Sequence, residues 1–207
     1  MTGPAVDADE EPAPDPDGEP APEPAVRLVR GTFAIDDLDA FLADLDGIAA
    51  ETGAVVQAFD VDLVVSPTQL REAARLAARA IARGEAVARD PAVEVLLYAA
   101  GRRQIDRALE LGVSEGERAT VVLLADFGDV PDAGRSTADL DAAVEAVRNL
   151  AVDAPGERIE ESDALDVAFD AERVREFYGV TDRELAATNG DLADVVRERA
   201  ALLDVEK

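Results

Sequence analysis

Hydrophobic positions follow two different periods along residues 25–207. Apolar residues at every second position, or in short unbroken runs, are typical of strands, and apolar residues three and four apart are typical of helices. This pattern predicts a strand at Val26–Ile35, one long or two short strands within Ala54–Val65, and a buried strand at Ala119–Phe127. Residues 157–169 are ambiguous and are compatible with a short strand.

Capping residues and glycines mark the helix boundaries. Ser66 is expected to be an N-cap, with Pro67 in the first helical position and Gln69 completing a capping box. The expected helices run from Asp36 to about Glu51, from Ser66 to about Arg83 before Gly84, from Pro91 to Leu111 before Gly112, from Ser136 to about Ala151, from Ala171 to Tyr178, from a capping box at Thr181 and Glu184 to Asn189-Gly190, and from Asp191 onward. The order β-α-β-α-α-β-α-(β)-α-α predicts an α/β fold, with a small mixed β-sheet flanked by helices.

The first 24 residues differ from the rest of the chain. They contain seven of the eleven prolines, eight acids and no base. Such a composition cannot bury enough apolar surface to offset its ordering entropy, which predicts a disordered acidic tail. We therefore expect one folded domain at residues 25–207 behind a tail at residues 1–24.

Composition excludes several kinds of chemistry. The chain has no cysteine and no histidine, and its one lysine is Lys207. A cysteine nucleophile, a disulfide, a thiolate zinc site, a histidine base and a P-loop are therefore excluded. There is no apolar run of about 18 residues and no basic leader of a secretory signal. We expect a cytoplasmic protein that does not span a membrane, with no metal or other cofactor.

The chain is strongly acidic. Forty-six Asp and Glu residues against 20 Lys and Arg residues give a formal net charge of −26. This balance argues against ordinary electrostatic attraction to nucleic acid or anionic lipid. Loss of lysine with an excess of acids fits a protein of a salt-loving microbe, a haloarchaeon, because at ~1 M salt the Debye length is only ~3 Å.

Residues 66–107 reverse the local charge. They hold eight arginines and five acids, for a net charge of +3. Arg71, Arg75, Arg79 and Arg83, the arginine ridge, are four apart and fall on one helix face, with Leu70, Ala74, Ala77 and Ile81 on the opposite face. The ridge is either a solvated face whose arginine stems cover apolar surface, or a docking surface for phosphates or a partner's carboxylates.

The helix expected at Pro91–Leu111 has an apolar first half and a polar second half. Ala92–Ala100 is apolar nearly all round, and Gly101-Arg102-Arg103-Gln104-Ile105 follows. On a continuous helix Gln104 would lie half-buried on the apolar flank. It is then either a structural amide, beside an Arg102–Asp106 ion pair, or part of a binding site.

The stretch EVLLYAAGRRQIDRALELG, Glu94–Gly112, resembles the signature of the kinase-binding regulatory subunit of the KEOPS complex, the PRPK-binding protein family. The family pattern is an apolar helix, a small residue, Gly, any residue, Arg-Gln-Ile and a second apolar helical run. Ala100 to Ile105 match it, and DVDLVV at Asp60–Val65 resembles the family's strand end. The resemblance covers roughly residues 26–203.

The resemblance implies a small α/β protein that is not an enzyme. Such subunits bind the small atypical kinase-ATPase of the complex and the single-stranded 3′ CCA end of tRNA, and so support threonylcarbamoylation of tRNA adenosine 37. The resemblance places Gly101, Arg103, Gln104 and Ile105 at or beside the RNA-end site. Arg102 and the arginine ridge are added to the candidate RNA-binding residues because of their charge alone.

Two other functions stay open at this point. One is a protein-only scaffold that activates the kinase subunit without significant RNA binding. The other is a metal-dependent hydrolase that uses clustered acids, namely Asp36, Asp37 and Asp39, or Asp126, Asp129 and Asp132, because oxygen ligands can hold Mg²⁺. Such clusters are expected by chance at this density of acids.

Overall fold

The computed structural model describes residues 22–151, 160–161, 168–188 and 190–205, and residues 1–21 of the expected tail lie outside these ranges. The strands are β1 (Val26–Ile35), β2 (Val55–Asp60), β3 (Gly116–Ala125) and β4 (Glu160–Glu161). The helices are α1 (Leu38–Thr52), α2 (Pro67–Ala82), α3 (Pro91–Ala99), α4 (Ile105–Ala108), α5 (Leu140–Leu150), α6 (Ala171–Tyr178), α7 (Asp182–Ala187) and α8 (Leu192–Val205), with 3₁₀ turns η1 (Val61–Leu63) and η2 (Leu109–Leu111).

The sheet has the strand order β2-β3-β1-β4. β3 lies between β1 and β2 and pairs antiparallel with both, in registers such as Val29↔Val122 and Ala58↔Val122. β1 and β2 therefore run in the same direction without touching, which is a split β-α-β arrangement. The expected α/β class is confirmed. The expectation of a mixed sheet is wrong for the described strands, because the intervening β3 makes every pair antiparallel.

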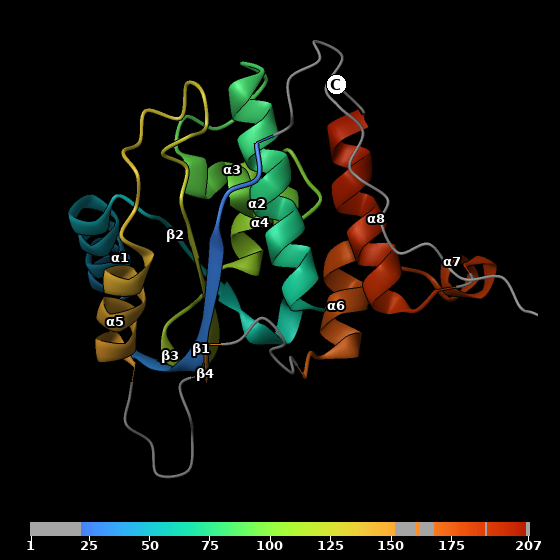
Figure 1. The fold of residues 1–207 in the computed structure, drawn as a ribbon. Coiled ribbons are helices and arrows are strands. Elements are labelled where there is room, and N and C mark those ends of the chain that lie inside the picture. Colours follow the sequence, from blue (N-terminus) through green and yellow to red (C-terminus); the bar gives the residue numbers. More distant parts are fainter. Residues whose placement is uncertain (1–21, 152–159, 162–167, 189, 206–207) are drawn as a thin grey trace, which may run out of the picture.

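Helices cover both faces of the sheet (Figure 1). α1 and α5 pack on one face, where Phe33, Phe41 and Val144 belong to one apolar cluster. α2 and α3 pack on the other face, and α6 and α8 pack outside them; Leu123, Leu96 and Val196 share the larger cluster there. The alternation along β3 produces this division, since Val122 and Leu124 face α1 and α5 while Val121 and Leu123 face α2 and α3.

Several boundaries are as expected from the sequence. β1 and α6 have the expected ends, the Thr181–Glu184 capping box opens α7, and β4 lies within residues 157–169. The hydroxyl of Ser66 accepts the N–H of Gln69 at the start of α2, and Asp191 accepts the N–H of Asp194 at the start of α8. Local capping chemistry therefore determines these helix starts.

Four expected boundaries are wrong, in addition to those of the helix expected at Pro91–Leu111. The carboxylate of Asp37, not Asp36, caps α1 by accepting the N–H of Ala40. The segment Ala54–Val65 is β2 followed by η1, because Asp60 accepts the N–H of Asp62 and turns the chain. Strand β3 spans Gly116–Ala125 and ends before Phe127. The fourth is the start of α5.

Helix α5 begins at Leu140 with Asp139 as its N-cap, not at Ser136. The backbone of Ser136 and Thr137 packs against two glycines instead. A Cβ on Gly128 would lie 2.5 Å from the Thr137 Cα, and one on Gly53 would lie 2.9 Å from the Ser136 Oγ. The N–H of Asp139 also binds the carbonyl of Thr52 at 2.8 Å. These contacts accompany a segment without helical structure that continues to Asp139.

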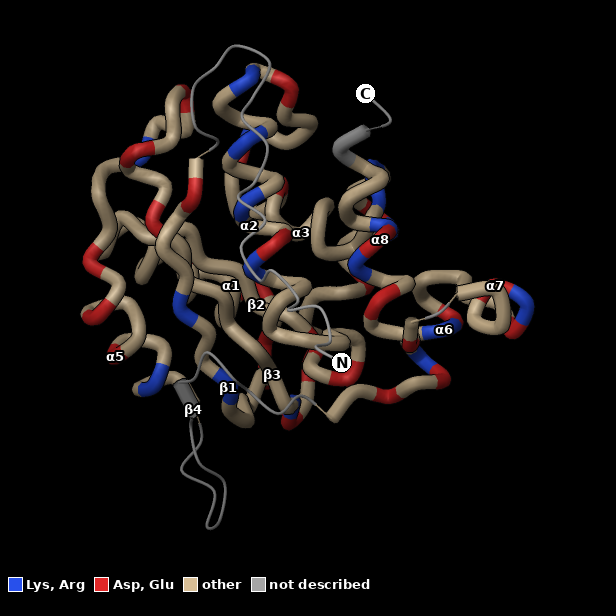
Figure 2. Tube along the Cα trace, turned by 45° about the vertical axis from the view of Figure 1, so that its right-hand side comes forward, with Lys and Arg blue, Asp and Glu red and all other residues tan. Residues whose placement is uncertain are grey.

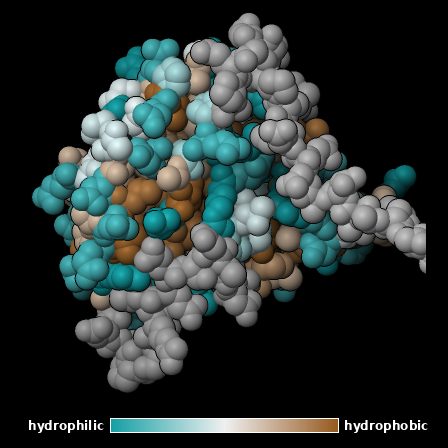
Figure 3. Space-filling view, viewed as in Figure 1, coloured by the Kyte–Doolittle hydropathy of each residue, from teal (hydrophilic) through white to brown (hydrophobic). Residues whose placement is uncertain are grey.

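Charge is distributed unevenly over this fold. Acidic positions are spread over most of the described trace, whereas basic positions recur along α2 (Figure 2). The face shown in Figure 3 is mostly hydrophilic, with a hydrophobic area near its centre. The basic positions on α2 therefore stand out against an acidic, hydrophilic surface.

Candidate nucleic-acid and partner interface

The Gly101–Ile105 segment is a helix end, so the single helix expected at Pro91–Leu111 is wrong. The N–H of Gly101 binds the carbonyl of Tyr98, and the N–H of Arg102 binds that of Leu97, both at 3.0 Å. This is a Schellman motif, in which the residue after the helix is left-handed. Gly101 has φ +59°, and a Cβ there would lie 3.2 Å from the Cβ of Arg199 on α8. Glycine is therefore favoured twice, by its φ and by the close approach of α8.

Arg102 ties this helix end to α6. Its Nη2 donates to the carbonyl oxygen of Phe177, near the C-terminus of α6. Its guanidinium carbon lies 4.9 Å from the centroid of the Phe177 ring, which is cation–π geometry. An Arg102–Asp106 ion pair was one interpretation of the sequence, but in the structure the Arg102 side chain contacts Phe177 of α6 instead.

Arg103 ties the same segment to α8. Its Nη2 donates to the carbonyl oxygen of Leu203 at 3.0 Å. Leu203 lies in the last turn of α8, where backbone carbonyls lack helical partners and attract cations. The two consecutive arginines thus bind two different helices through their C-terminal carbonyls.

Gln104 and Ile105 point outward. Gln104 is exposed and is the N-cap residue of α4 without a side-chain capping bond, and Ile105 is 42% exposed. The expectation that Gln104 is half-buried is wrong, because the break at Gly101 changes the helical phase. An exposed amide beside an exposed apolar side chain offers hydrogen bonds and apolar contact to a ligand.

A cleft of about 330 Å³, which we call the motif cleft, brings residues 101–104 together, whereas Ile105 is not among its lining residues. Its lining residues are Ala100, Gly101, Arg102, Arg103, Gln104, Tyr178, Arg199 and Leu203. Three of these are arginines and none is an acid, in a chain of net charge −26. The motif cleft therefore suits an anionic or hydrogen-bonding ligand.

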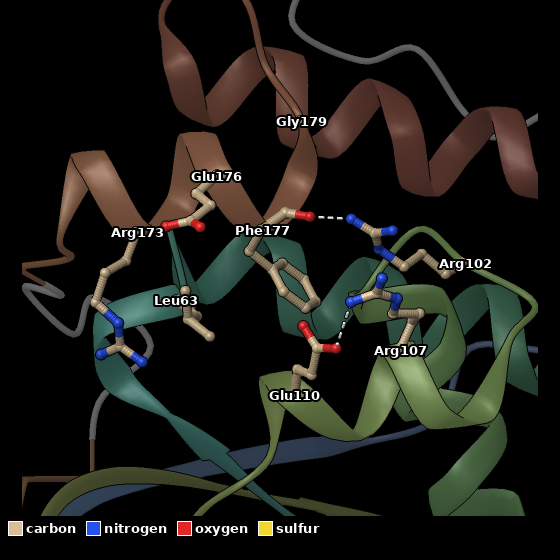
Figure 4. A pocket seen from close by; sticks show the side chains of 8 residues that line it. All are labelled: Leu63, Arg102, Arg107, Glu110, Arg173, Glu176, Phe177 and Gly179. Atoms are coloured by element: carbon tan, nitrogen blue, oxygen red, sulfur yellow. Dashed lines mark hydrogen bonds and ion pairs between the residues drawn. The ribbon is translucent and has the colours of Figure 1, made fainter.

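Arg102 separates the motif cleft from a second, larger cleft of about 610 Å³, the α6 cleft (Figure 4). Arg107 pairs there with Glu110 at 2.9 Å, and Arg173 binds both Asp60 and Asp62 at 2.8 Å. The hydrogen bond to Asp60 raises the pKa of the Arg173 guanidinium.

Arg199 of the motif cleft also has a carboxylate partner, Glu184 at 2.7 Å. Arg102 and Arg103, in contrast, bind backbone carbonyls. The motif cleft therefore keeps two arginines that bind carbonyls rather than carboxylates, and it suits an anion better than the α6 cleft does.

A buried hydrogen-bond network supports the motif cleft from below. The amide nitrogen of Gln69 donates to the Tyr178 hydroxyl at 2.6 Å and to the Ala99 carbonyl at 2.9 Å. Its amide oxygen accepts the N–H of Val65, so it does not complete the expected capping box with Ser66. Burial raises the pKa of the Tyr178 phenol, although its bond with Gln69 acts in the opposite direction.

Sequence reasoning missed Tyr178, Phe177 and Arg199. Tyr178 and Arg199 line the motif cleft and Phe177 lines the α6 cleft, through contacts between α3, α6 and α8 that no local pattern encodes. The one signal in the chain was Gln69 at an apolar helix position, because a buried amide requires partners elsewhere.

The arginine ridge does not line either of these clefts. Its four arginines lie on one face of α2 and are each partly buried rather than fully in water. Arg75 binds the carboxylate of Glu72 at 2.6 Å. Leu70, Ala74, Ala77 and Ile81 are buried on the opposite face, as expected.

One residue of each acid cluster has a structural role. Asp37 caps α1, and Oδ1 of Asp126 accepts the N–H groups of Gly128 and Ala138. Within the described ranges, no group of three or more Asp or Glu residues is arranged to hold a metal ion. In the same part of the chain, no helix has both the length and the apolar character needed to cross a membrane.

The fold and these clefts define an α/β domain with an arginine-lined surface cleft at a junction of helices. A protein-family model described as "Kinase binding protein CGI-121" matches residues 41–204. The chain belongs to this family, and the resemblance noted in its sequence is confirmed. A search of curated protein sequences finds no match.

Proposed function

We propose that this chain is a non-catalytic subunit that binds a small kinase-ATPase and the 3′ CCA end of tRNA. In the KEOPS complex it would thereby support threonylcarbamoylation of tRNA adenosine 37. Membership of a family described as kinase-binding supports the first activity. The arginine-lined motif cleft with its exposed amide supports the second.

The chemistry of the motif cleft matches that of a single-stranded RNA end. Proteins read such ends by stacking, arginine contacts and hydrogen bonds to base edges. Arg103 donates one N–H to the carbonyl of Leu203. Because a guanidinium has five N–H donors, others can bind a phosphate. The exposed Gln104 amide can pair with a base edge, and the exposed Ile105 side chain can contact a base.

Short-range contacts of this kind suit an acidic protein. In concentrated salt the counterion-release contribution to RNA affinity becomes small. Hydrogen bonds and stacking inside a cleft depend much less on salt. RNA binding is therefore compatible with a net charge of −26.

The test compares intact tRNA with tRNA that lacks its CCA end, in concentrated KCl. We expect the wild type and the Arg107→Ala control to prefer intact tRNA, and Gln104→Ala to lose that preference. Arg107 is a suitable control because it is an exposed arginine that lines only the α6 cleft of the two. Equal binding of both tRNAs by the wild type would contradict the RNA-end proposal.

Binding of the kinase-ATPase is measured separately, by titration calorimetry with the purified kinase subunit. A kinase complex that forms while the two tRNAs bind equally would identify the chain as a protein-only scaffold. Absence of a complex with the kinase would contradict the kinase-binding part of the proposal.

A further inference from the structure

Helix α2 presents a narrow basic stripe on its outer side. Between Arg71 and Arg83, the positions that are not fully buried are the four arginines of the ridge, Glu72 and Ala82. Four positive charges and one negative charge give the stripe a net charge of +3. At 1.5 Å per residue, the ridge extends for about 18 Å.

The N-terminal segment enters the fold beside this stripe. Glu23, Pro24 and Val26 line a groove of about 340 Å³ together with Thr68, Arg71, Glu72 and Arg75. The chain that precedes Pro22 is therefore attached next to the Arg71 end of the ridge. Any segment just before it has a high effective concentration at the ridge, because the link is covalent and short.

The sequence of residues 1–21 complements the ridge in charge. It carries seven acids and no base. Prolines at every second position through Pro12, Pro14 and Pro16 favour an extended backbone. The acids are Asp7, Asp9, Glu10, Glu11, Asp15, Asp17 and Glu19.

The spacing of the acids also matches the ridge. Asp15, Asp17 and Glu19 alternate, and two residues of extended chain span about 6.5 Å. Successive arginines of the ridge, four helical residues apart, are about 6 Å apart. The four residue steps from Glu19 to Glu23 extend to about 13 Å, enough to reach from the groove onto the middle of α2.

We propose that the acidic segment at residues 15–19, which extends to about 13 Å, docks along the arginine ridge of α2. Carboxylates that contact guanidinium groups directly form charge-assisted hydrogen bonds, which hold at short range even where salt screens distant charges. The docked carboxylates occupy the positions that phosphates or a partner's acids would take. A ligand of the ridge must therefore compete with the chain's own acidic segment. This interaction requires neither the kinase nor tRNA, so it stands or falls independently of the proposed function.

The chain itself provides a clean test, because it contains no cysteine. Ala13→Cys in the full chain accepts a single nitroxide label, and NMR then measures the broadening of backbone amide signals. We expect signals of residues 71–83 on α2 to broaden severalfold more than those of α5, which covers the opposite face of the sheet.

Two charge variants of the labelled chain identify the groups responsible. Asp15→Asn, Asp17→Asn and Glu19→Gln together are expected to reduce the broadening on α2 to the level of α5. Asp129→Asn, Asp141→Asn and Glu145→Gln remove three exposed acids elsewhere, and are expected to leave it unchanged. Equal broadening of α2 and α5 in the unsubstituted chain, or unchanged broadening after neutralisation of the segment, would overturn the proposal.

Discussion

The side-chain amide of Gln69 donates a 2.6 Å hydrogen bond to the hydroxyl of Tyr178, which in turn donates to the carbonyl oxygen of Ala99. The two side chains come from α2 and α6 and meet beneath the end of α3. All of these atoms are buried. The helix end that carries Gly101 is therefore held in place from inside the fold.

Removal of the Tyr178 hydroxyl should destabilise the protein without changing the shape of the core. Tyr178→Phe keeps the ring but leaves one Gln69 donor without its acceptor, for which we expect a loss of about 1–3 kcal/mol. Denaturant unfolding in concentrated KCl measures this. An unchanged free energy of unfolding would show that the network contributes nothing net.

The same phenol makes stability depend on alkaline pH. Burial raises the pKa of Tyr178 above its unfolded value of about 10, so the folded state keeps the proton longer than the unfolded state. Its contribution to stability is complete below pH ~10 and falls as the pH rises further. We expect the free energy of unfolding to fall above this pH more steeply in the wild type than in Tyr178→Phe. Parallel curves would contradict the expectation.

Gly101 should tolerate a side chain less well than Gly84 does. Both glycines follow a helix with positive φ, +59° and +67°, so alanine costs about 1–2 kcal/mol at either from the left-handed backbone. Gly101→Ala adds a contact of 3.2 Å with the Cβ of Arg199, whereas a Cβ on Gly84 meets nothing within 4 Å. We expect the larger loss of unfolding free energy at Gly101, measured by denaturation. Equal losses of unfolding free energy in the two variants would mean that α8 moves away from the new Cβ without an energetic penalty.

Arg102 and Arg107 are both arginines of the α6 cleft but should differ in their effect on stability. Arg102→Ala removes the bond to the Phe177 carbonyl and the cation–π contact, for about 1–3 kcal/mol. Arg107→Ala removes only an exposed ion pair with Glu110, for less than about 1 kcal/mol. Thermal unfolding of the two variants distinguishes them, and similar melting temperatures would contradict the structural role of Arg102.

Substitutions of Gln104 and Arg103 should distinguish effects on tRNA binding from effects on stability. Gln104→Ala changes an exposed side chain, so we expect the free energy of unfolding to stay within about 0.5 kcal/mol while binding of intact tRNA weakens. Arg103→Ala also removes the bond to the Leu203 carbonyl and should lower both stability and binding. Faster amide hydrogen exchange in the last turn of α8 would report the loss of this bond in Arg103→Ala. If Gln104→Ala binds tRNA as the wild type does, Gln104 is not a contact residue.

Elements whose signals are local could be predicted from the sequence. β1 and α6 have their expected ends, because alternation in the first and an Asp cap with a closing glycine in the second are complete within each segment. The α7 capping box is equally local. The α/β class follows from the order of such elements.

The candidate site could be predicted only in part. The Gly101–Ile105 residues do line or flank one cleft, but a single helix through them was expected, and helical phase then placed Gln104 on the wrong side. The break at Gly101 is closed by local bonds to Tyr98 and Leu97, but the α8 wall of the cleft, including Arg199, comes from almost one hundred residues further along the chain. Ser136 failed as a cap for a similar reason, since its surroundings come from residues near Gly53 and Gly128.

The bond between Arg103 and the Leu203 carbonyl links the motif cleft thermodynamically to the end of α8. A ligand that draws the guanidinium away from that carbonyl removes a favourable cation from the C-terminus of α8 and so destabilises its last turn. Coupling free energies are reciprocal, so a partner that clamps α8 in its helical form weakens such a ligand, and one that unwinds the turn strengthens it. The conformation of the last turn of α8 therefore modulates the affinity of any such ligand of the motif cleft.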